Sequence, residues 1–246
     1  MKIKDIYNFL DKIAPFSTAA QWDNTGLSVG SLEEEVSKIV LSLDVTKDVI
    51  SYAKERGAQL VITHHPLIFD GVKAVEKGSV LYDAVMSGLT FISSHTCLDK
   101  AQGGVNECLA KAVGIKKLRQ SELDEFLKIG EVDSVSAEEF AKIIKASLSA
   151  RVTFTDNGKI IKKVALCSGS GGDLVGIAAT EGADAFLTGE AKHHEILEAN
   201  SLGICLFCAG HYETENIILE PLKEYIAKEF SNIQVEIFSP SPYRHF

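Results

Sequence analysis

The chain has 246 residues, 46% of them hydrophobic and 24% charged, so it can bury a large core in one domain or two. Its formal net charge of −9 at pH 7 argues against broad binding to nucleic acid, which relies on Lys and Arg neutralising phosphates. The five cysteines lie mostly in apolar contexts, and neither a signal-peptide core nor a bilayer-spanning apolar run is present, so we expect a cytoplasmic protein without a membrane partner.

Hydrophobic periodicity predicts alternating helices and strands along most of the chain. In the first part we expect a helix at 2–13, a turn at 22–26 that feeds a strand, a strand at 38–44, a helix at 46–56, a strand at 58–63, a helix at 80–87, a strand at 88–94 and a helix at 103–113. Beyond a break near 115–125 we expect strands at 126–132, 150–155, 161–167, 184–188, 203–208 and 233–238, and helices at 136–149, 173–180, 191–199 and 214–229. Strand–helix–strand order favours parallel pairing, so the expected fold class is α/β.

A strand–helix–strand segment occurs twice, 125 positions apart. The residues that recur unchanged after this shift are Lys38, Leu41, Asp48, Ala53, Gly57, Ala58 and Thr63. Each copy continues to a further strand that ends in His-x-x-x-carboxylate, at His95–Asp99 and at His211–Glu215. We therefore expect two interlocked α/β domains related by this repeat, residues 1–120 and 121–246, with a dinuclear metal site between them.

Histidines supply the main candidate metal ligands. All seven except His245 lie at or just past a predicted strand end, where ligands bind in open α/β sheets. His64 and His65 directly follow the strand at 58–63, and two neighbours just past a strand can converge on a pair of ions. The alternative, that one of them is a solvated loop histidine, has about equal weight from this motif alone.

Two carboxylates stand four residues after a histidine. The spacing places His211 and Glu215 on one face of a helix if the helix has already started. A carboxylate in a first helical turn is also favoured by the helix dipole, so capping is an alternative explanation of Glu215. The same spacing in His95 and Asp99 makes coincidence less attractive, and Asp99 and Glu215 are the candidates to bridge two ions.

Other signals are weaker. The loop Ser168, Gly169, Ser170, Gly171 and Gly172 lies between a strand and a helix, where backbone N–H groups can hold a phosphate, although such glycines are also common for turn geometry alone. His193 and His194 could belong to a solvated helix face or could act on a substrate. Trp22 is expected to be a packing residue, and Cys97 is a conceivable soft ligand.

Five motifs together resemble the Nif-three-like family, whose members are often called GTP cyclohydrolase I type 2 homologues. These are Trp22-Asp-Asn-Thr-Gly-Leu27, Thr63-His-His-Pro-Leu-Ile-Phe69, His95-Thr-Cys-Leu-Asp99, Thr188-Gly-Glu190 with His193-His194, and Gly210-His-Tyr-Glu-Thr-Glu215. The resemblance covers nearly the whole chain and fits the short form without a central insertion. It implies two α/β domains, a dinuclear metal site between them and a ring-shaped homohexamer. The family's metal ligands fall on His64, His65, Asp99, His211 and Glu215, and His95 falls on a histidine beside the metals.

The leading hypothesis is a metal-dependent hydrolase of a small nucleotide or other phosphate-containing substrate, with two divalent ions per chain, Zn, Fe, Mn or Ni. Bound ions would lower the pKa of water and polarise the bond under attack, while His95, His193 or His194 could move protons. A cyclohydrolase reaction on guanine and attack on phosphorus both stay open. The rival hypothesis is a non-catalytic, metal-binding ring-shaped scaffold or regulatory protein, whose metal site would be closed by protein ligands.

Overall fold

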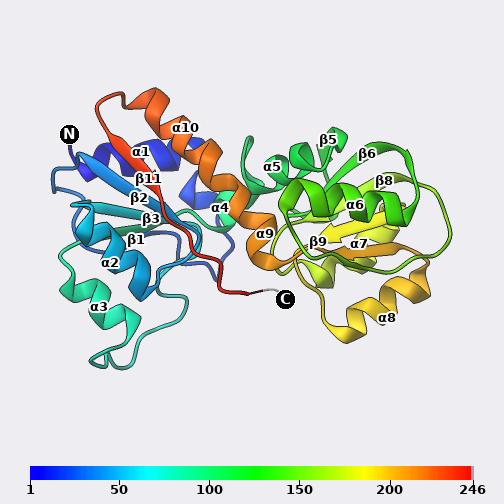
Figure 1. Cartoon of the computed structure of the whole chain (residues 1–246), viewed down its shortest axis with the longest axis horizontal. Coiled ribbons are helices and arrows are strands. Elements are labelled where there is room, and N and C mark those ends of the chain that lie inside the picture. The colour runs from blue at the N-terminus through cyan, green and yellow to red at the C-terminus, as the bar shows by residue number, and fades with distance from the viewer. Residues whose placement is uncertain (245–246) are drawn as a thin grey trace. The chain divides into compact units, whose positions relative to one another are not determined.

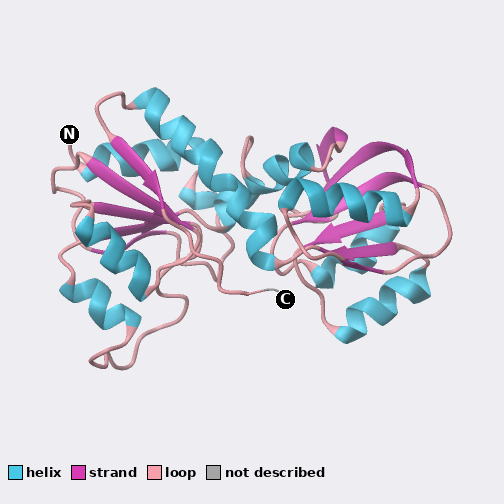
Figure 2. Ribbon diagram, viewed as in Figure 1, coloured by secondary structure: helices cyan, strands magenta, loops and turns pink. Residues whose placement is uncertain are grey.

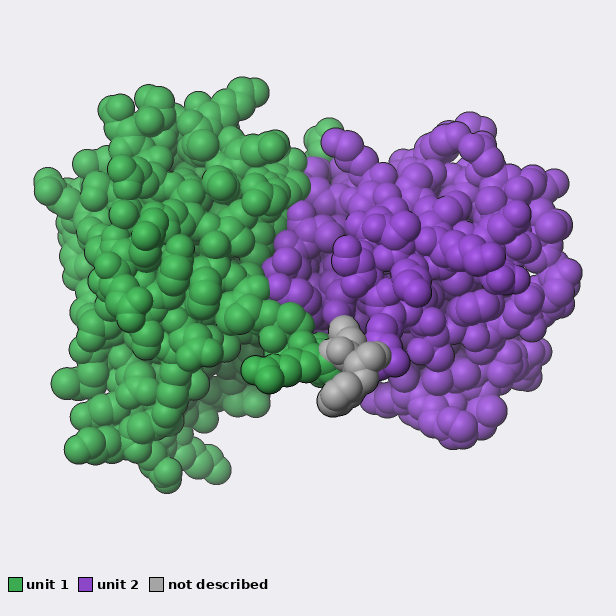
Figure 3. All heavy atoms as spheres, in the orientation of Figure 1, with its two compact units in different colours: residues 1–102, 218–246 green, residues 103–217 purple. Residues whose placement is uncertain are grey.

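The computed structural model describes residues 1–244, so His245 lies outside the described part, and the chain forms two compact units (Figure 3). The first unit contains residues 1–102 and 218–246, and the second contains residues 103–217. This division differs from the expected halves 1–120 and 121–246. The reason is that the last strand, β11 (Gln234–Ile237), pairs in parallel with β2 (Lys38–Ser42), which returns the end of the chain to the first sheet.

The first unit is a five-stranded sheet with helices packed against it (Figure 1). Its strands, in spatial order, are β1 (Gly26–Val29), β4 (Thr90–Ser93), β3 (Leu60–Thr63), β2 and β11. Its helices are α1 (Ile3–Ile13), α2 (Lys47–Glu55), α3 (Val80–Met86), α4 (Thr96–Lys100) and α10 (Leu219–Glu229), with a 3-10 turn η1 (Phe16–Thr18). Strands β3 and β4 are buried at every residue, as expected for central strands covered on both faces.

Helices cover the first sheet by burying one apolar stripe each. Val49 and Ala53 of α2 and Ala84 of α3 pack in one cluster with Val61 and Phe91 of the sheet. Helix α10 packs on β11 and β2, and α1 meets the residue after α10 through an edge-to-face contact between Phe9 and Phe230, with ring centroids 5.4 Å apart. These contacts pack α10 and β11, which come from the end of the chain, against the first unit, which contains the N-terminal helix α1.

The second unit is a six-stranded sheet with helices on both faces (Figure 2). Its strands, in spatial order, are β5 (Lys116–Gln120), β6 (Lys128–Val135), β8 (Ile161–Cys167), β9 (Ala185–Thr188), β10 (Cys205–Cys208) and β7 (Thr153–Phe154). Its helices are α5 (Val105–Ala112), α6 (Ala137–Leu148), α7 (Val175–Thr180), α8 (His193–Leu202) and α9 (His211–Glu215), with 3-10 turns η2 (Gly172–Leu174) and η3 (Asn216–Ile218) at its end.

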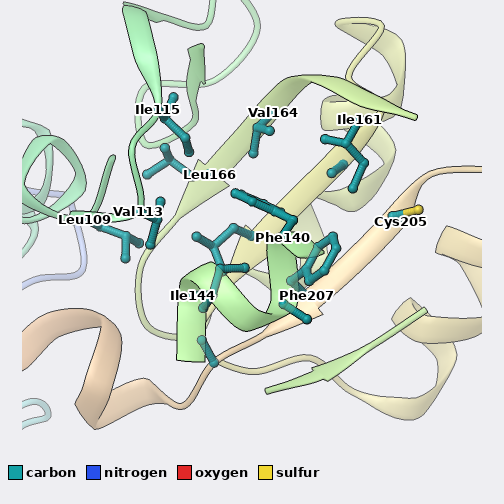
Figure 4. Close-up of a cluster of buried hydrophobic side chains, with 14 of the residues drawn as sticks. Leu109, Val113, Ile115, Phe140, Ile144, Ile161, Val164, Leu166, Cys205 and Phe207 are labelled. Atoms are coloured by element: carbon teal, nitrogen blue, oxygen red, sulfur yellow. The ribbon is translucent and has the colours of Figure 1, made fainter. Parts of the chain in front are cut away.

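The core of the second unit lies on the two faces of its sheet. On one face Phe140 and Ile144 of α6 pack against Val164, Leu166 and Phe207 of the strands (Figure 4). A separate cluster on the other face joins α7 and α8 to the alternate strand residues. Alternation of buried side chains between the two faces is what fixes the register of such a sheet.

The internal repeat predicted from the sequence is confirmed in the strand pairing. Strands β2 and β3 are parallel with Ile39 opposite Leu60, and the residues 125 positions later, Val164 and Ala185, are opposite each other in β8 and β9. Strands β4 and β10 then add in parallel to β3 and β9, and β1 and β7 add antiparallel at the edges. The copies differ where β11 runs parallel to β2 but β6 runs antiparallel to β8.

An ion pair between Glu236 on β11 and Arg56, the residue after α2, leads us to expect that the stability of the first unit falls at low pH. Hydrogen bonds from the Arg56 guanidinium and the Tyr52 hydroxyl lower the pKa of the Glu236 carboxyl to about 2. Because this pKa is lower in the folded than in the unfolded chain, the stabilisation is complete above about pH 4.3 and is lost as the pH falls towards 2. We expect Glu236→Gln to lower the melting temperature at pH 7 and to flatten its dependence on pH below 5.

The exposed Glu229→Gln removes the same charge from the end of α10 and serves as the control. Melting followed by circular dichroism from pH 7 to pH 2.5 tests the expectation. If Glu236→Gln and Glu229→Gln melt alike across this range, the ion pair does not stabilise the unit.

Candidate metal centre

Three imidazoles of the first unit lie together where β3 and β4 end. His64 and His65 directly follow β3, and His95 lies two residues beyond β4. One ring nitrogen from each histidine lies within 4.8 Å of the others. His64 is 2% exposed and the His65 side chain 14%, so neither is a solvated loop histidine, which was the alternative for this motif.

Asp99 adds a carboxylate to this group. It lies on α4, the short helix that starts just after His95, and its Oδ1 is 3.5 Å from Nε2 of His64. The four-residue spacing of His95 and Asp99 therefore brings both to the carboxyl ends of the central strands. Imidazole nitrogen and carboxylate oxygen are ligand types for Zn, Fe, Mn and Ni.

The Nδ1 atom of each imidazole in this group faces an oxygen acceptor. The acceptors are the Ser94 carbonyl for His64 (3.0 Å), Asp44 Oδ1 for His65 (2.7 Å) and Asp23 Oδ1 for His95 (2.9 Å). A hydrogen on Nδ1 fixes the tautomer and presents Nε2 as the basic nitrogen. Histidines that bind metal almost always donate their other N–H in this way. The donor set of the first unit thus fits a divalent metal ion.

Asp23 is held more tightly than the other two acceptors. Its side chain is fully buried, and it also accepts hydrogen bonds from the backbone N–H and hydroxyl of Thr96. Burial would raise the pKa of Asp23, but the hydrogen bonds from His95 and Thr96 outweigh burial and lower it. Asp23 is therefore an ionised acceptor that orients the imidazole of His95.

The second unit carries a histidine–carboxylate pair on α9. Nε2 of His211 lies 3.0 Å from Oε2 of Glu215, and Nδ1 lies 2.9 Å from Oε1 of Glu190. The helix begins at His211 and ends at Glu215, so Glu215 is not in the first turn. N-terminal capping, the alternative explanation of Glu215, is therefore wrong, because the acidic residue of the first turn is Glu213.

The glycine-rich loop passes close to this pair. A Cβ atom on Gly169 would overlap the Glu215 carboxylate and lie 3.2 Å from Nε2 of His211. Gly169 also has a φ of +62°, which glycine adopts without steric strain. The N–H groups of three loop residues already donate within the protein, Ser168 to Asn106, Gly169 to Thr214 and Gly171 to Thr188. Phosphate binding here stays a prediction that would have to use the N–H groups of Ser170 and Gly172.

Gly169→Ala is expected to disturb the histidine–carboxylate pair. Gly182→Ala is a matched control in the same unit, because its φ is +73° but its nearest neighbour, Lys163 Nζ, is 3.7 Å away. Each variant should lose about 1–2 kcal/mol from the left-handed backbone, but only Gly169→Ala should also weaken metal binding by displacing Glu215. Melting curves and metal titrations of both variants test this. Equal metal affinity of the two variants would show that the close approach of this loop to Glu215 and His211 does not require a glycine at position 169.

The remaining candidates lie elsewhere. His193 and His194 begin α8 and are exposed, and Nε2 of His194 is 3.8 Å from Glu195. Within the described residues 1–244, neither joins a histidine–carboxylate group close enough to hold a metal ion, and their catalytic role stays a prediction. Cys97 is buried against Thr25 and Ser94, and burial raises the pKa of its thiol.

The roles of three carboxylates could not be predicted from the sequence: Asp44, Asp23 and Glu190 orient His65, His95 and His211, respectively. Asp44 lies two residues beyond β2 and Glu190 two residues beyond β9, so their position at strand ends was a usable signal. Residue 190 lies 125 positions after residue 65, so Glu190 in the second copy of the repeat corresponds to His65 in the first copy. The second unit therefore has a supporting carboxylate at the position where the first unit has an imidazole. Trp22 was also misjudged: it is 66% exposed and is not a packing residue.

These features define the class of protein: an α/β protein with two sheets and groups of histidine and carboxylate that could bind a metal ion. No helix within residues 1–244 is long and apolar enough to cross a membrane.

Comparison with known proteins agrees with this class. The family described as Duf34/NIF3 (NGG1p interacting factor 3) matches residues 1–242. Relatives from Clostridium perfringens and Campylobacter jejuni, each called a GTP cyclohydrolase 1 type 2 homolog, are 33% and 34% identical. The alignments cover 94% and 100% of this chain, and the same shares of the relatives. The chain belongs to the Duf34/NIF3 family, as the motifs predicted.

Solved structures of relatives have the same fold. A Staphylococcus aureus hypothetical protein superimposes with a TM-score of 0.91 at 30% identity, covering 100% of this chain and 99% of its own. Reduced HcgD from Methanocaldococcus jannaschii gives a TM-score of 0.86 at 29% identity, covering 96% and 97%. The alignment with one S. aureus relative runs over 353 positions, more than the 246 of this chain, which fits a short form without an insertion.

Proposed function

We propose that this protein is a metal-dependent hydrolase that acts on a small nucleotide or another phosphate-containing substrate. Two divalent ions per chain would be held as a dinuclear centre by His64, His65, Asp99, His211 and Glu215. The observation that carries the proposal is a hydrogen-bonding pattern that the candidate histidines of both units have in common. His64, His65, His95 and His211 each have Nδ1 against an oxygen and so offer Nε2 as the basic nitrogen.

The chain's own residues would bind, orient and move protons. Bound divalent ions supply Lewis acidity and lower the pKa of water near the substrate. His95, oriented by Asp23, accepts a proton at Nε2 from the attacking water and returns it to the leaving group. Catalysis rather than scaffolding is favoured because five protein ligands shared by two ions leave coordination positions for water and substrate.

Elemental analysis combined with a screen for turnover tests the proposal. The purified protein, freed of loosely bound metal and reloaded with Zn, Mn, Fe or Ni, should retain about two ions per chain. The screen begins with GTP, because relatives are called GTP cyclohydrolase 1 type 2 homologs, and continues with other nucleotides and phosphate esters. A protein that binds none of the four metals contradicts the proposal, and metal binding without any turnover would favour the scaffold.

We also propose that the protein is a homohexamer, on the strength of the family motifs. Light scattering of the purified protein in the micromolar range should report about six times the chain mass of 26.7 kDa. A monomer throughout the range would contradict the proposal.

A further inference from the structure

Two large aromatic side chains stay exposed beside His95. Trp22 is 66% exposed and Phe69 is 51% exposed. Each ring centroid lies 5.8 Å from that of His95, with interplanar angles of 71° and 90°. Single exposed apolar residues are ordinary, but two exposed aromatic rings that both contact one candidate catalytic histidine are not explained by burial in a core.

Hydrogen bonds hold the two loops that carry these rings. The Asn24 side chain, two residues after Trp22, donates to the carbonyl of Ile68, the neighbour of Phe69, at 2.8 Å. On the other side of Trp22, the N–H of Ala20 donates to the hydroxyl of Thr96. Asp23, between Trp22 and Asn24, is the buried acceptor of His95. The backbone next to both rings is therefore fixed relative to His95 before any ligand arrives.

We propose that Trp22 and Phe69 form a stacking surface for a planar heteroaromatic ring of the substrate, such as a purine base. The inference rests on the proposed function, because it takes the group around His95 to be the substrate site. Aromatic side chains stack on the π-face of any base and so recognise a ring without requiring a particular hydrogen-bond pattern. A ring held there lies beside the imidazole that moves the proton.

Fluorescence reports on this surface directly, because Trp22 is the single tryptophan of the chain. Titration with guanosine 5′-monophosphate should quench its emission in a saturable way. Ribose 5-phosphate, which has the phosphate but no base, should leave the emission unchanged. Phe69→Ala should weaken the binding of the nucleotide about tenfold, as expected from the loss of one stacking partner.

Phe154→Ala is the matched control. Phe154 is also an exposed phenylalanine, 37% exposed, but it lies on β7 in the second unit. Its removal should not change the affinity for the nucleotide. Melting curves of both variants confirm that the chain is folded before titration.

Two results of the titrations would overturn the inference: no saturable quenching up to millimolar nucleotide, or equal affinity of Phe69→Ala and the unmodified chain for the nucleotide. Failure of acrylamide to quench the emission of Trp22 would also overturn it, because the ring would then be buried in an interface between copies of the chain. Titrations with and without bound metal separate this inference from the proposed function. Quenching in a protein that never binds metal would keep the stacking surface and refute the metal-dependent hydrolase. Metal binding without quenching would refute the stacking surface alone.

Discussion

Replacing Glu215 by glutamine is expected to weaken metal binding by more than about 100-fold. The variant keeps the size of the side chain but removes the charge of the carboxylate beside Nε2 of His211. Residues that only support a ligand typically change metal affinity by about 10–100-fold. Because we propose that Glu215 is itself a ligand that bridges two ions, its loss should exceed that range. Isothermal titration of the metal-free protein with Zn or Mn measures the effect.

His193→Ala is the comparison for this prediction, because His193 is exposed at the start of α8. Its affinity for metal should change less than about tenfold. If both variants lose metal equally, Glu215 is not a ligand of special importance and the assignment of the second unit's ligands is wrong.

Asp23→Asn is expected to abolish most turnover while leaving the metal in place. An asparagine amide cannot accept hydrogen bonds from both His95 and Thr96 with the atoms that Asp23 uses, and its NH₂ group would force Nδ1 of His95 to become an acceptor. The hydrogen then moves to Nε2, which can no longer take a proton from water. Loss of a positioned acid–base group typically costs about 10²–10⁴-fold in rate, so kcat should fall by this factor with little change in KM.

Asp44→Asn makes the same chemical change in the hydrogen-bond acceptor of His65. Asp44 accepts from His65, which we propose is a metal ligand, so this variant should lose about 10–100-fold in metal affinity. The contrast between the two variants tests the proposed proton transfer by His95 separately from the proposed metal binding by His65. If Asp23→Asn releases metal as readily as Asp44→Asn does, His95 is a ligand and its assignment as the proton-transfer group is wrong.

Local apolar pattern was sufficient to predict most elements of both sheets. The expected strand at 161–167 has the bounds of β8, and the expected helix at 46–56 contains α2. Strand β5 was missed because Lys116–Gln120 is mostly charged and lies at the sheet edge, where no alternation of buried residues marks a strand. Helix α4 was missed because five residues are too few to show helical periodicity.

The other features that the sequence could not predict depend on contacts between residues that lie far apart in the chain. The pairing of β11 with β2 joins residues almost 200 positions apart, so no local signal could return residues 218–246 to the first unit. Asp23 lies 72 positions from the histidine that it orients. The candidate histidines could be predicted because each follows a strand. Asp44 and Glu190 also follow strands, but which histidine each of them orients depends on contacts that form only when the chain folds.

We propose above that one chain binds two divalent ions through His64, His65, Asp99, His211 and Glu215. Anomalous scattering from crystals of the Zn-loaded protein tests it most directly, because the peaks give both the number of ions and their ligands. We expect two peaks per chain, about 3.5–4 Å apart, with imidazole nitrogens at about 2.0–2.1 Å. Absence of ordered peaks, or peaks bound by other residues of the chain, would contradict the claim.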